Sequence, residues 1–196
     1  MVRRVVLLWC HLKVSGAENV PVSGAVIVAP VHRSSFDFLP LYFITDRELY
    51  FLVRSEVFSF RALGWLLRRL GCIPIDRSGG SNLNAMRQAE EVLAAGHVLV
   101  IFPEGKVCAG AEIVISDGAA FLSARSGAPI IPVGIGGSDA VLGMGMRIPQ
   151  PAPVRVVVGE AVVSLERGAK RSALTQKSTE LRDALTSVYQ QSLGLR

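Results

Sequence analysis

Short β-branched runs alternate with stretches of helical periodicity along this chain, and this alternation limits its possible folds more than any other feature. Each run is apolar and uninterrupted, which is typical of strands buried on both faces of a sheet. The alternation therefore predicts an α/β fold in which a mixed β-sheet is flanked by helices. The six expected strands are residues 25–29, 49–53, 72–75, 98–102, 130–135 and 154–158.

Glycines mark the ends of the helices expected between these strands. Residues 83–93 carry apolar side chains at helical spacing and are followed by Gly96, while residues 117–125 are followed by Gly127. The tail shows the same periodicity and predicts a C-terminal helix at about residues 171–193.

One domain is expected to contain the whole chain, residues 1–196, because the sequence shows no repeat, low-complexity linker or break in composition. The glycine-rich segment 134–145 lacks the third glycine and the downstream acid of a dinucleotide-binding motif. It is therefore predicted to be a loop.

Composition and charge narrow the classes of partner. Half of the residues are hydrophobic, yet no apolar run approaches the roughly 20 residues needed to span a bilayer. The net charge is +5 and arginine outnumbers lysine, which suits anionic lipid, a phosphorylated substrate or an acidic carrier protein. Nucleic acid would require a denser basic stripe. Cys10, Cys72 and Cys108 lack C-x2-C spacing, so we expect reduced thiols of a cytoplasmic protein and no metal site.

His32 and Asp37 follow directly on the first long apolar run and are candidates for acid–base chemistry. Five residues of straight helix would turn the two side chains about 140° apart, so they can meet only on a bend. There the carboxylate could hold one ring nitrogen while the other accepts a proton. Ser34 and Asp37 also form the pattern of a helix capping box, which is commoner, and these six residues alone favour that interpretation.

Two further polar clusters follow expected strands. Arg77 ends residues 71–77, and its planar fork of donors matches a phosphate, although this segment alone favours a surface ion pair with Asp76 or another acid. Residues 102–106 read Phe-Pro-Glu-Gly-Lys and could hold hydroxyls and a phosphate, or simply form a turn. Ligands of open α/β sheets bind at the carboxyl ends of strands, so the three clusters together indicate one site.

Taken in order, these motifs resemble the glycerolipid acyltransferases typified by 1-acylglycerol-3-phosphate acyltransferase. The resemblance runs from about residue 14 to residue 163. It rests on Glu18-Asn19-x-Pro21, the H-x4-D pair His32 and Asp37, and the segments 54–58, 64–65, 71–77, 102–105, 118–120 and 129–133.

The resemblance implies a role for each matched residue. His32 would be the general base and Asp37 its orienting partner, while Arg77 would bind the acceptor phosphate. Acceptor-site groups would be Glu104 and Gly105, with Pro132 beside the acyl channel. Ser34 and Ser35 lack the setting of a nucleophile and are expected to cap the helix or donate hydrogen bonds, Ser35 at the substrate.

The implied reaction moves a fatty acyl group from acyl-CoA or acyl-carrier protein to the hydroxyl of a lysophospholipid, in the first place 1-acylglycerol-3-phosphate, giving phosphatidate. No cofactor is expected. The chain departs from the family where Lys106 and Val107 replace the usual Thr-Arg after Gly105, and lysine cannot reproduce the bidentate geometry of arginine. Alternatives therefore stay open: another lysolipid or glycolipid acceptor, a thioesterase-like hydrolase, or a non-catalytic lipid-binding homologue.

Residues 59–70 are candidates for docking on an anionic membrane surface, because they pair an apolar face with cations. An ordinary amphipathic helix packed on the sheet would have the same pattern. The docking hypothesis places the protein at the cytoplasmic face of the cell membrane as a peripheral protein. Its apolar side chains are Leu63, Trp65, Leu66, Leu67 and Leu70, and its cations are Arg61, Arg68 and Arg69.

Overall fold

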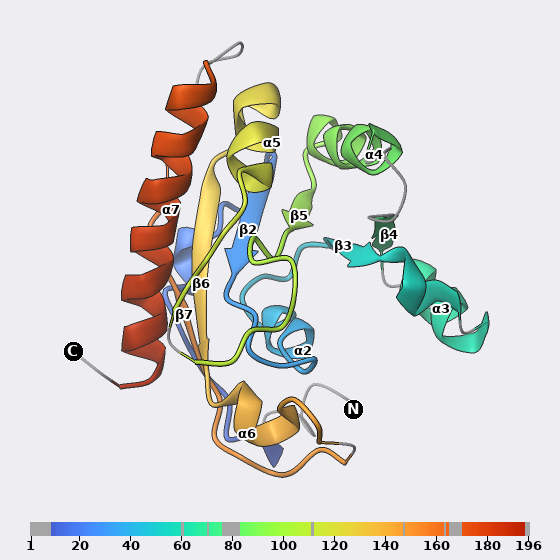
Figure 1. Cartoon of the computed structure of the whole chain (residues 1–196), viewed down its shortest axis with the longest axis vertical. Helices are drawn as coiled ribbons and strands as arrows, with labels where there is room; N and C mark the ends of the chain where they lie inside the picture. The colour runs from blue at the N-terminus through green and yellow to red at the C-terminus, as the bar shows by residue number, and fades with distance from the viewer. Residues whose placement is uncertain are drawn as a thin grey trace.

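A seven-stranded sheet runs through the molecule in the order β1-β7-β6-β2-β5-β3-β4 (Figure 1). The computed structural model describes residues 9–59, 61–69, 71–75, 83–110, 112–146, 148–162, 164 and 170–194. The strands are β1 (Lys13–Ser15), β2 (Val26–Pro30), β3 (Leu49–Arg54), β4 (Cys72–Ile75), β5 (Val98–Val100), β6 (Ile130–Gly136) and β7 (Arg155–Val158).

The sheet is mixed, as predicted. Neighbouring strands from β6 through β2, β5 and β3 to β4 are parallel, whereas β7 is antiparallel to β6. All six predicted strands are present. The edge strand β1, parallel to β7, was not predicted because its three partly exposed residues carry no apolar run.

The helices predicted at residues 83–93, 117–125 and 171–193 are present as α4, α5 and α7, and shorter helices connect the other strands. The helices are η1 (Ala17–Asn19), α2 (Phe38–Leu41), η2 (Ser55–Ser59), α3 (Arg61–Arg69), α4 (Leu83–Ala94), α5 (Gly118–Ser126), α6 (Ser138–Leu142) and α7 (Arg171–Ser192). Gly127 ends α5 in the left-handed region, with φ of 78°, and donates its N–H to the carbonyl of Ser123.

The prediction that residues 134–145 form a loop is wrong. Strand β6 continues to Gly136 and α6 follows it. The physical reason is close packing, because a Cβ on Gly134 would lie 2.2 Å from the carbonyl oxygen of Val188 in α7. Gly134 and Gly136 let α7 approach the strand rather than freeing the backbone for a turn.

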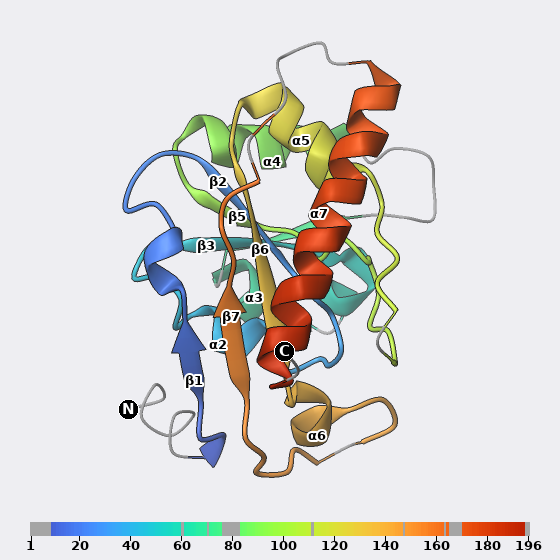
Figure 2. The same cartoon turned by 90° about the vertical axis from the view of Figure 1, so that its left-hand side faces the viewer.

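The central strands place the site. Every residue of β2, β5 and β6 is buried, which explains their uninterrupted apolar sequences. Because β6, β2, β5, β3 and β4 are parallel, their carboxyl ends lie along one edge of the sheet. Helix α7 lies along β6 and β7, and α3 lies at the opposite end of the molecule (Figures 1 and 2).

Candidate active site

The segment 31–37 between β2 and α2, here called the catalytic loop, brings His32 and Asp37 together. The Nδ1 atom of His32 lies 3.0 Å from Oδ2 of Asp37. A carboxylate can only accept, so Nδ1 carries the proton and the other ring nitrogen is left as an acceptor. This is the arrangement in which a histidine can act as a general base.

Asp37 also holds the bend of the catalytic loop. Its Oδ2 accepts the N–H groups of Arg33 at 2.7 Å and Ser34 at 2.8 Å, and the residue is fully buried. Ser34 turns its hydroxyl elsewhere, accepting the Phe36 N–H and donating to the carbonyl of Leu142. The half of a capping box that Asp37 supplies is therefore present beside the histidine contact, and the two interpretations from the sequence are compatible.

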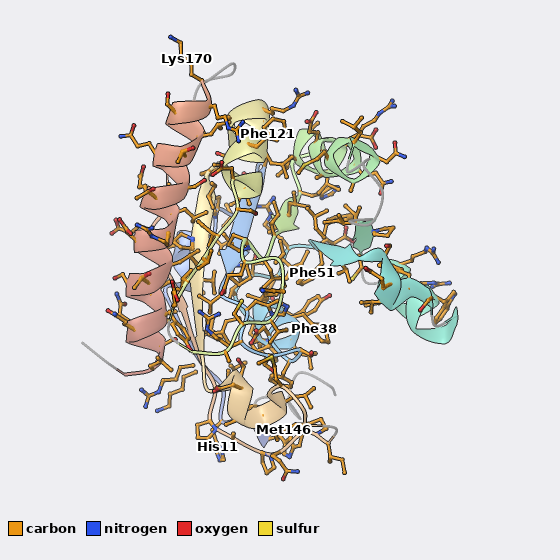
Figure 3. All side chains as sticks on the ribbon, viewed as in Figure 1. His11, Phe38, Phe51, Phe121, Met146 and Lys170 are labelled. Carbon is orange, nitrogen blue, oxygen red and sulfur yellow. The ribbon has the colours of Figure 1, made fainter. Side chains whose placement is uncertain are left out.

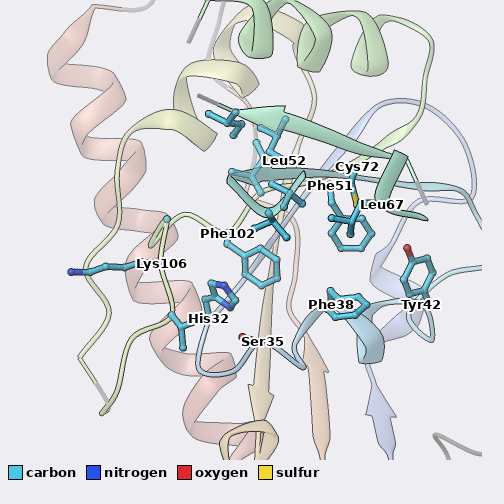
Figure 4. Close-up of a pocket in the computed structure, with 16 residues that line it drawn as sticks. His32, Ser35, Phe38, Tyr42, Phe51, Leu52, Leu67, Cys72, Phe102 and Lys106 are labelled. Atoms are coloured by element: carbon cyan, nitrogen blue, oxygen red, sulfur yellow. The ribbon is translucent and has the colours of Figure 1, made fainter. Parts of the chain in front are cut away.

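An apolar cavity of about 530 Å³ opens beside the imidazole. The ring of His32 packs on Phe102, with ring centroids 4.2 Å apart, and its side chain is 20% exposed. His32 and Ser35 lie at one end of the cavity, and Tyr42 and Cys72 lie at the other (Figure 4). Its wall includes Phe38 and Phe51, both labelled in Figure 3, with Leu52, Val53, Val57, Leu67, Ile75 and Ile101.

Two polar side chains, Tyr42 and Cys72, are partly buried at the far end of the cavity. Burial raises the pKa of the Cys72 thiol to about 11. Burial, with a smaller contribution from Cys72, raises the pKa of the Tyr42 hydroxyl to about 12. Both groups are therefore neutral near physiological pH, and this end of the cavity presents no charge from them.

Glu104 is in the site, but its carboxylate faces protein groups. Its Oε1 accepts the N–H of His32 at 2.8 Å, and its Oε2 pairs with Nη1 of Arg33 at 2.6 Å. Both side chains are almost fully buried. Burial lowers the pKa of Arg33, but the hydrogen bond and charge of Glu104 outweigh it, so the pKa is raised overall. Direct contact of Glu104 with an acceptor stays a prediction.

Arg33 is the site residue that sequence reasoning missed. It stands between His32 and Ser34, where a surface cation or a substrate ligand would also fit. Its partner Glu104 lies 71 positions away in sequence, so no local pattern identifies the pair. The signal available was the occurrence of both residues beside the ends of neighbouring strands, β2 and β5.

The other predicted site residues differ in where they lie relative to the cavity. Ser35, Gly105 and Lys106 line the cavity, although the ammonium group of exposed Lys106 points away from it (Figure 4). Pro132 is buried in β6 opposite Ala29 and is absent from the cavity wall. Arg77 lies outside the described residues, so its phosphate contact stays a prediction.

Helix α3 presents part of the predicted docking face. Trp65 is 59% exposed, and the guanidinium of Arg69 lies 5.1 Å from the centroid of its ring. Arg68 is also exposed, while Leu67 contributes to the cavity wall. The side chains of Arg61, Leu63 and Leu66 lie outside the described ones.

The described residues lack a metal-binding cluster and a membrane-spanning helix. They hold no cluster of three or more histidine, cysteine, aspartate or glutamate side chains able to bind a metal ion. Within the same residues, the helices are too short or too polar to cross a bilayer.

Known proteins resemble this chain in sequence and in fold. A family model described as Acyltransferase matches residues 11–136. A 1-acyl-sn-glycerol-3-phosphate acyltransferase of Streptococcus pneumoniae is 30% identical over 147 residues, which are 71% of this chain and 54% of that protein. The chloroplastic enzyme BAT2 of Brassica napus, with the same activity in its name, is 23% identical over 76% of this chain and 44% of its own length. The chain thus spans about half the length of these curated relatives.

The fold also matches a solved structure. The crystal structure of the 1-acyl-sn-glycerophosphate acyltransferase PlsC from Thermotoga maritima superposes with a TM-score of 0.74 at 21% identity, covering 94% of this chain and 76% of PlsC. The family match contains the His32–Asp37 pair and Glu104 and extends over more than half of the chain. The chain therefore belongs to the acyltransferase family, which confirms the resemblance inferred from its motifs.

Proposed function

We propose that this chain is a 1-acylglycerol-3-phosphate O-acyltransferase, which moves a fatty acyl group from a thioester to the hydroxyl of lysophosphatidate and forms phosphatidate. The observation that carries this proposal is the imidazole of His32, oriented by Asp37 at one end of a long apolar cavity. The names of the curated relatives support the choice of acceptor.

The chemistry needs one base and no covalent intermediate. His32 takes the proton of the acceptor hydroxyl through Nε2 while the oxygen attacks the thioester carbonyl carbon. The tetrahedral oxyanion then collapses, the carbon–sulfur bond breaks, and the thiolate takes the proton back from the imidazolium. Asp37 accepts from Nδ1 throughout and stabilises the positive ring, as the carboxylate of a hydrolase triad does.

The cavity suits the acyl chain. A volume of about 530 Å³ lies in the range of small-molecule sites, and most of the cavity wall is apolar. Each methylene group buried there contributes about 0.8 kcal/mol to binding. The acyl-CoA or acyl-carrier protein donor would therefore place its thioester beside His32 and its hydrocarbon towards Tyr42 and Cys72.

The acceptor phosphate is assigned to Arg77, with Lys106 as a second cation. Arginine can bind phosphate through two parallel hydrogen bonds, whereas lysine supplies a point charge. Lys106 is exposed, and its flexible four-carbon stem allows the ammonium group to turn towards a phosphate dianion.

Peripheral attachment to the cytoplasmic face of the membrane completes the proposal. The exposed indole of Trp65 and the cations Arg68 and Arg69 lie on α3, which also contributes Leu67 to the cavity wall. An amphipathic helix with this composition binds anionic interfaces. A lipid acceptor and a long-chain donor would then reach the site from the membrane surface.

The test is a transfer assay with purified protein, radiolabelled acyl-CoA and a panel of lysolipids. The proposal predicts labelled phosphatidate from lysophosphatidate, and a loss of roughly 10²–10⁴ in rate for His32→Ala. Arg77→Ala should raise KM for lysophosphatidate far more than for an uncharged monoacylglycerol. Release of free fatty acid with no labelled lipid would refute the transferase proposal and indicate a hydrolase.

A further inference from the structure

A buried chain of contacts joins the C-terminal helix to the catalytic loop. The guanidinium of Arg33 lies 4.9 Å from the centroid of the Tyr189 ring, which α7 supplies. Arg33 is only 4% exposed, and it also donates to the carbonyl of Glu112 at 3.2 Å. A guanidinium removed from water depends on such partners, because an uncompensated buried charge is strongly unfavourable.

The same guanidinium also contacts the backbone of His32. Nη1 of Arg33 donates to the His32 carbonyl at 3.3 Å and holds Oε2 of Glu104. The other oxygen of Glu104 accepts the His32 N–H. The His32 carbonyl also accepts the N–H of Cys108 at 2.9 Å, so the Arg33–Glu104 pair holds the His32 N–H through Glu104 and shares the carbonyl with Cys108. Together these bonds fix the direction in which the imidazole leaves the chain.

Close packing of α7 on β6 fixes the position of Tyr189. A Cβ on Gly134 would lie 2.7 Å from the backbone nitrogen of Tyr189, so α7 lies against β6 at backbone contact. Further along α7, Ser178 donates to Oδ1 of Asp117 at 2.6 Å. Helix α7 cannot slide along β6 without breaking these contacts. They therefore fix the position of the Tyr189 ring beside the guanidinium of Arg33.

We propose that Tyr189 is a positioning residue for acyl transfer, acting through Arg33 and Glu104 on the backbone of His32. This inference rests on the proposed function and extends it to α7, which lies beyond the matched family region 11–136. None of Tyr189, Arg33 and Glu104 lines the cavity. A loss of Tyr189 should therefore change kcat and leave KM for the acyl donor unaltered.

Kinetics of three α7 variants make the first test. Tyr189→Leu removes the aromatic face and should lower kcat roughly tenfold, which corresponds to about 1.4 kcal/mol. Tyr189→Phe keeps a ring over the guanidinium and should restore most of kcat. Leu181→Ala is the matched control, because it truncates a fully buried α7 side chain two helical turns from Tyr189 and should lower thermal stability without lowering kcat.

A spectroscopic test does not depend on turnover. In histidine ¹⁵N-labelled protein, with His32→Ala used for assignment, the wild-type ring should show a single Nδ1–H tautomer. Tyr189→Leu should give a mixture of tautomers or broadened signals, and Tyr189→Phe and Leu181→Ala should not. Arg33→Lys keeps the charge but loses the planar fork, so it should show the same change as Tyr189→Leu and replaces that variant if it does not fold.

The outcomes separate two failures. If Tyr189→Leu matches Leu181→Ala in kcat and leaves the His32 signals unchanged, the positioning role is overturned. If wild-type protein transfers no acyl group while Tyr189→Leu still disturbs the His32 ring, the proposed function fails and the positioning role stands.

Discussion

Replacing Asp37 with asparagine separates the charge of the carboxylate from its shape. Oδ2 of Asp37 accepts from two backbone N–H groups and from Nδ1 of His32, so an amide nitrogen cannot occupy that position. The amide oxygen must take it, and the amide nitrogen then replaces Oδ1, which has no hydrogen-bond partner in the described part of the chain. The imidazole keeps its tautomer, and Asp37→Asn removes the negative charge alone.

The expected loss follows from that charge. A carboxylate and an imidazolium with charge centres about 4 Å apart attract by about 4 kcal/mol at an effective dielectric constant of about 20. The neutral amide oxygen retains a hydrogen bond of about 1 kcal/mol. The transition state should therefore lose about 2–4 kcal/mol, a fall in kcat of roughly 30- to 1,000-fold. The buried amide N–H, left without an acceptor, should lower the free energy of unfolding by about 1–3 kcal/mol.

Single-turnover transfer from labelled acyl-CoA measures the chemical step, and urea unfolding shows whether the variant is folded in the assay. Asp183→Asn is the matched control, since Asp183 is an exposed acid on α7 that pairs with the exposed Arg182 and whose charge should not matter for the chemical step. A folded Asp37→Asn protein with kcat within about twofold of wild type would refute the reasoning. Asp37 would then serve only to hold the bend.

Three other perturbations test separate parts of the molecule. Trp65→Ser should weaken pelleting with anionic liposomes, and Leu83→Ser, at an even more exposed position on α4, should not. Unchanged pelleting in both would exclude α3 as the docking face. Arg47 donates to three backbone carbonyls, so Arg47→Ala should lower the free energy of unfolding by about 1–3 kcal/mol, measured in urea, and an unaltered midpoint would contradict this. Burial raises the pKa of Cys72 to about 11, so alkylation of its thiol should be slow near neutral pH and accelerate towards pH 11. Bound acyl-CoA should slow the alkylation, because Cys72 lines the cavity. Peptide mass spectrometry measures the rate, and equal rates with and without acyl-CoA would place the acyl chain elsewhere.

The parts of the fold that the sequence predicted are those with a local cause. Buried parallel strands need apolar side chains on both faces, so β2 and β6 are visible as continuous runs. The end of α5 could be predicted because the left-handed backbone conformation at Gly127 favours glycine. His32 and Asp37 meet across a single bend, so the sequence brings them together without information from the rest of the chain.

The parts that were missed depend on contacts between distant segments. Glycine has two uses in proteins, freeing a turn and admitting a close neighbour, and both give the same letter in a sequence. Gly134 was read as the first use and serves the second, because its neighbour is α7, more than 50 positions later. The error in the segment 134–145 and the omission of Tyr189 therefore have the same origin.

Arg33 shows why a buried charge is harder to predict than a buried apolar residue. An apolar side chain is stabilised by almost any dense surroundings, so its periodicity alone indicates burial. A guanidinium is stable in the interior only where a particular carboxylate, carbonyl and ring converge on it. For Arg33 these are Glu104, the carbonyl of Glu112 and Tyr189, from two stretches of chain, the segment between β5 and α5 and helix α7. Because the same guanidinium also contacts the backbone of His32, the geometry of the proposed general base depends on segments that no motif around the histidine includes.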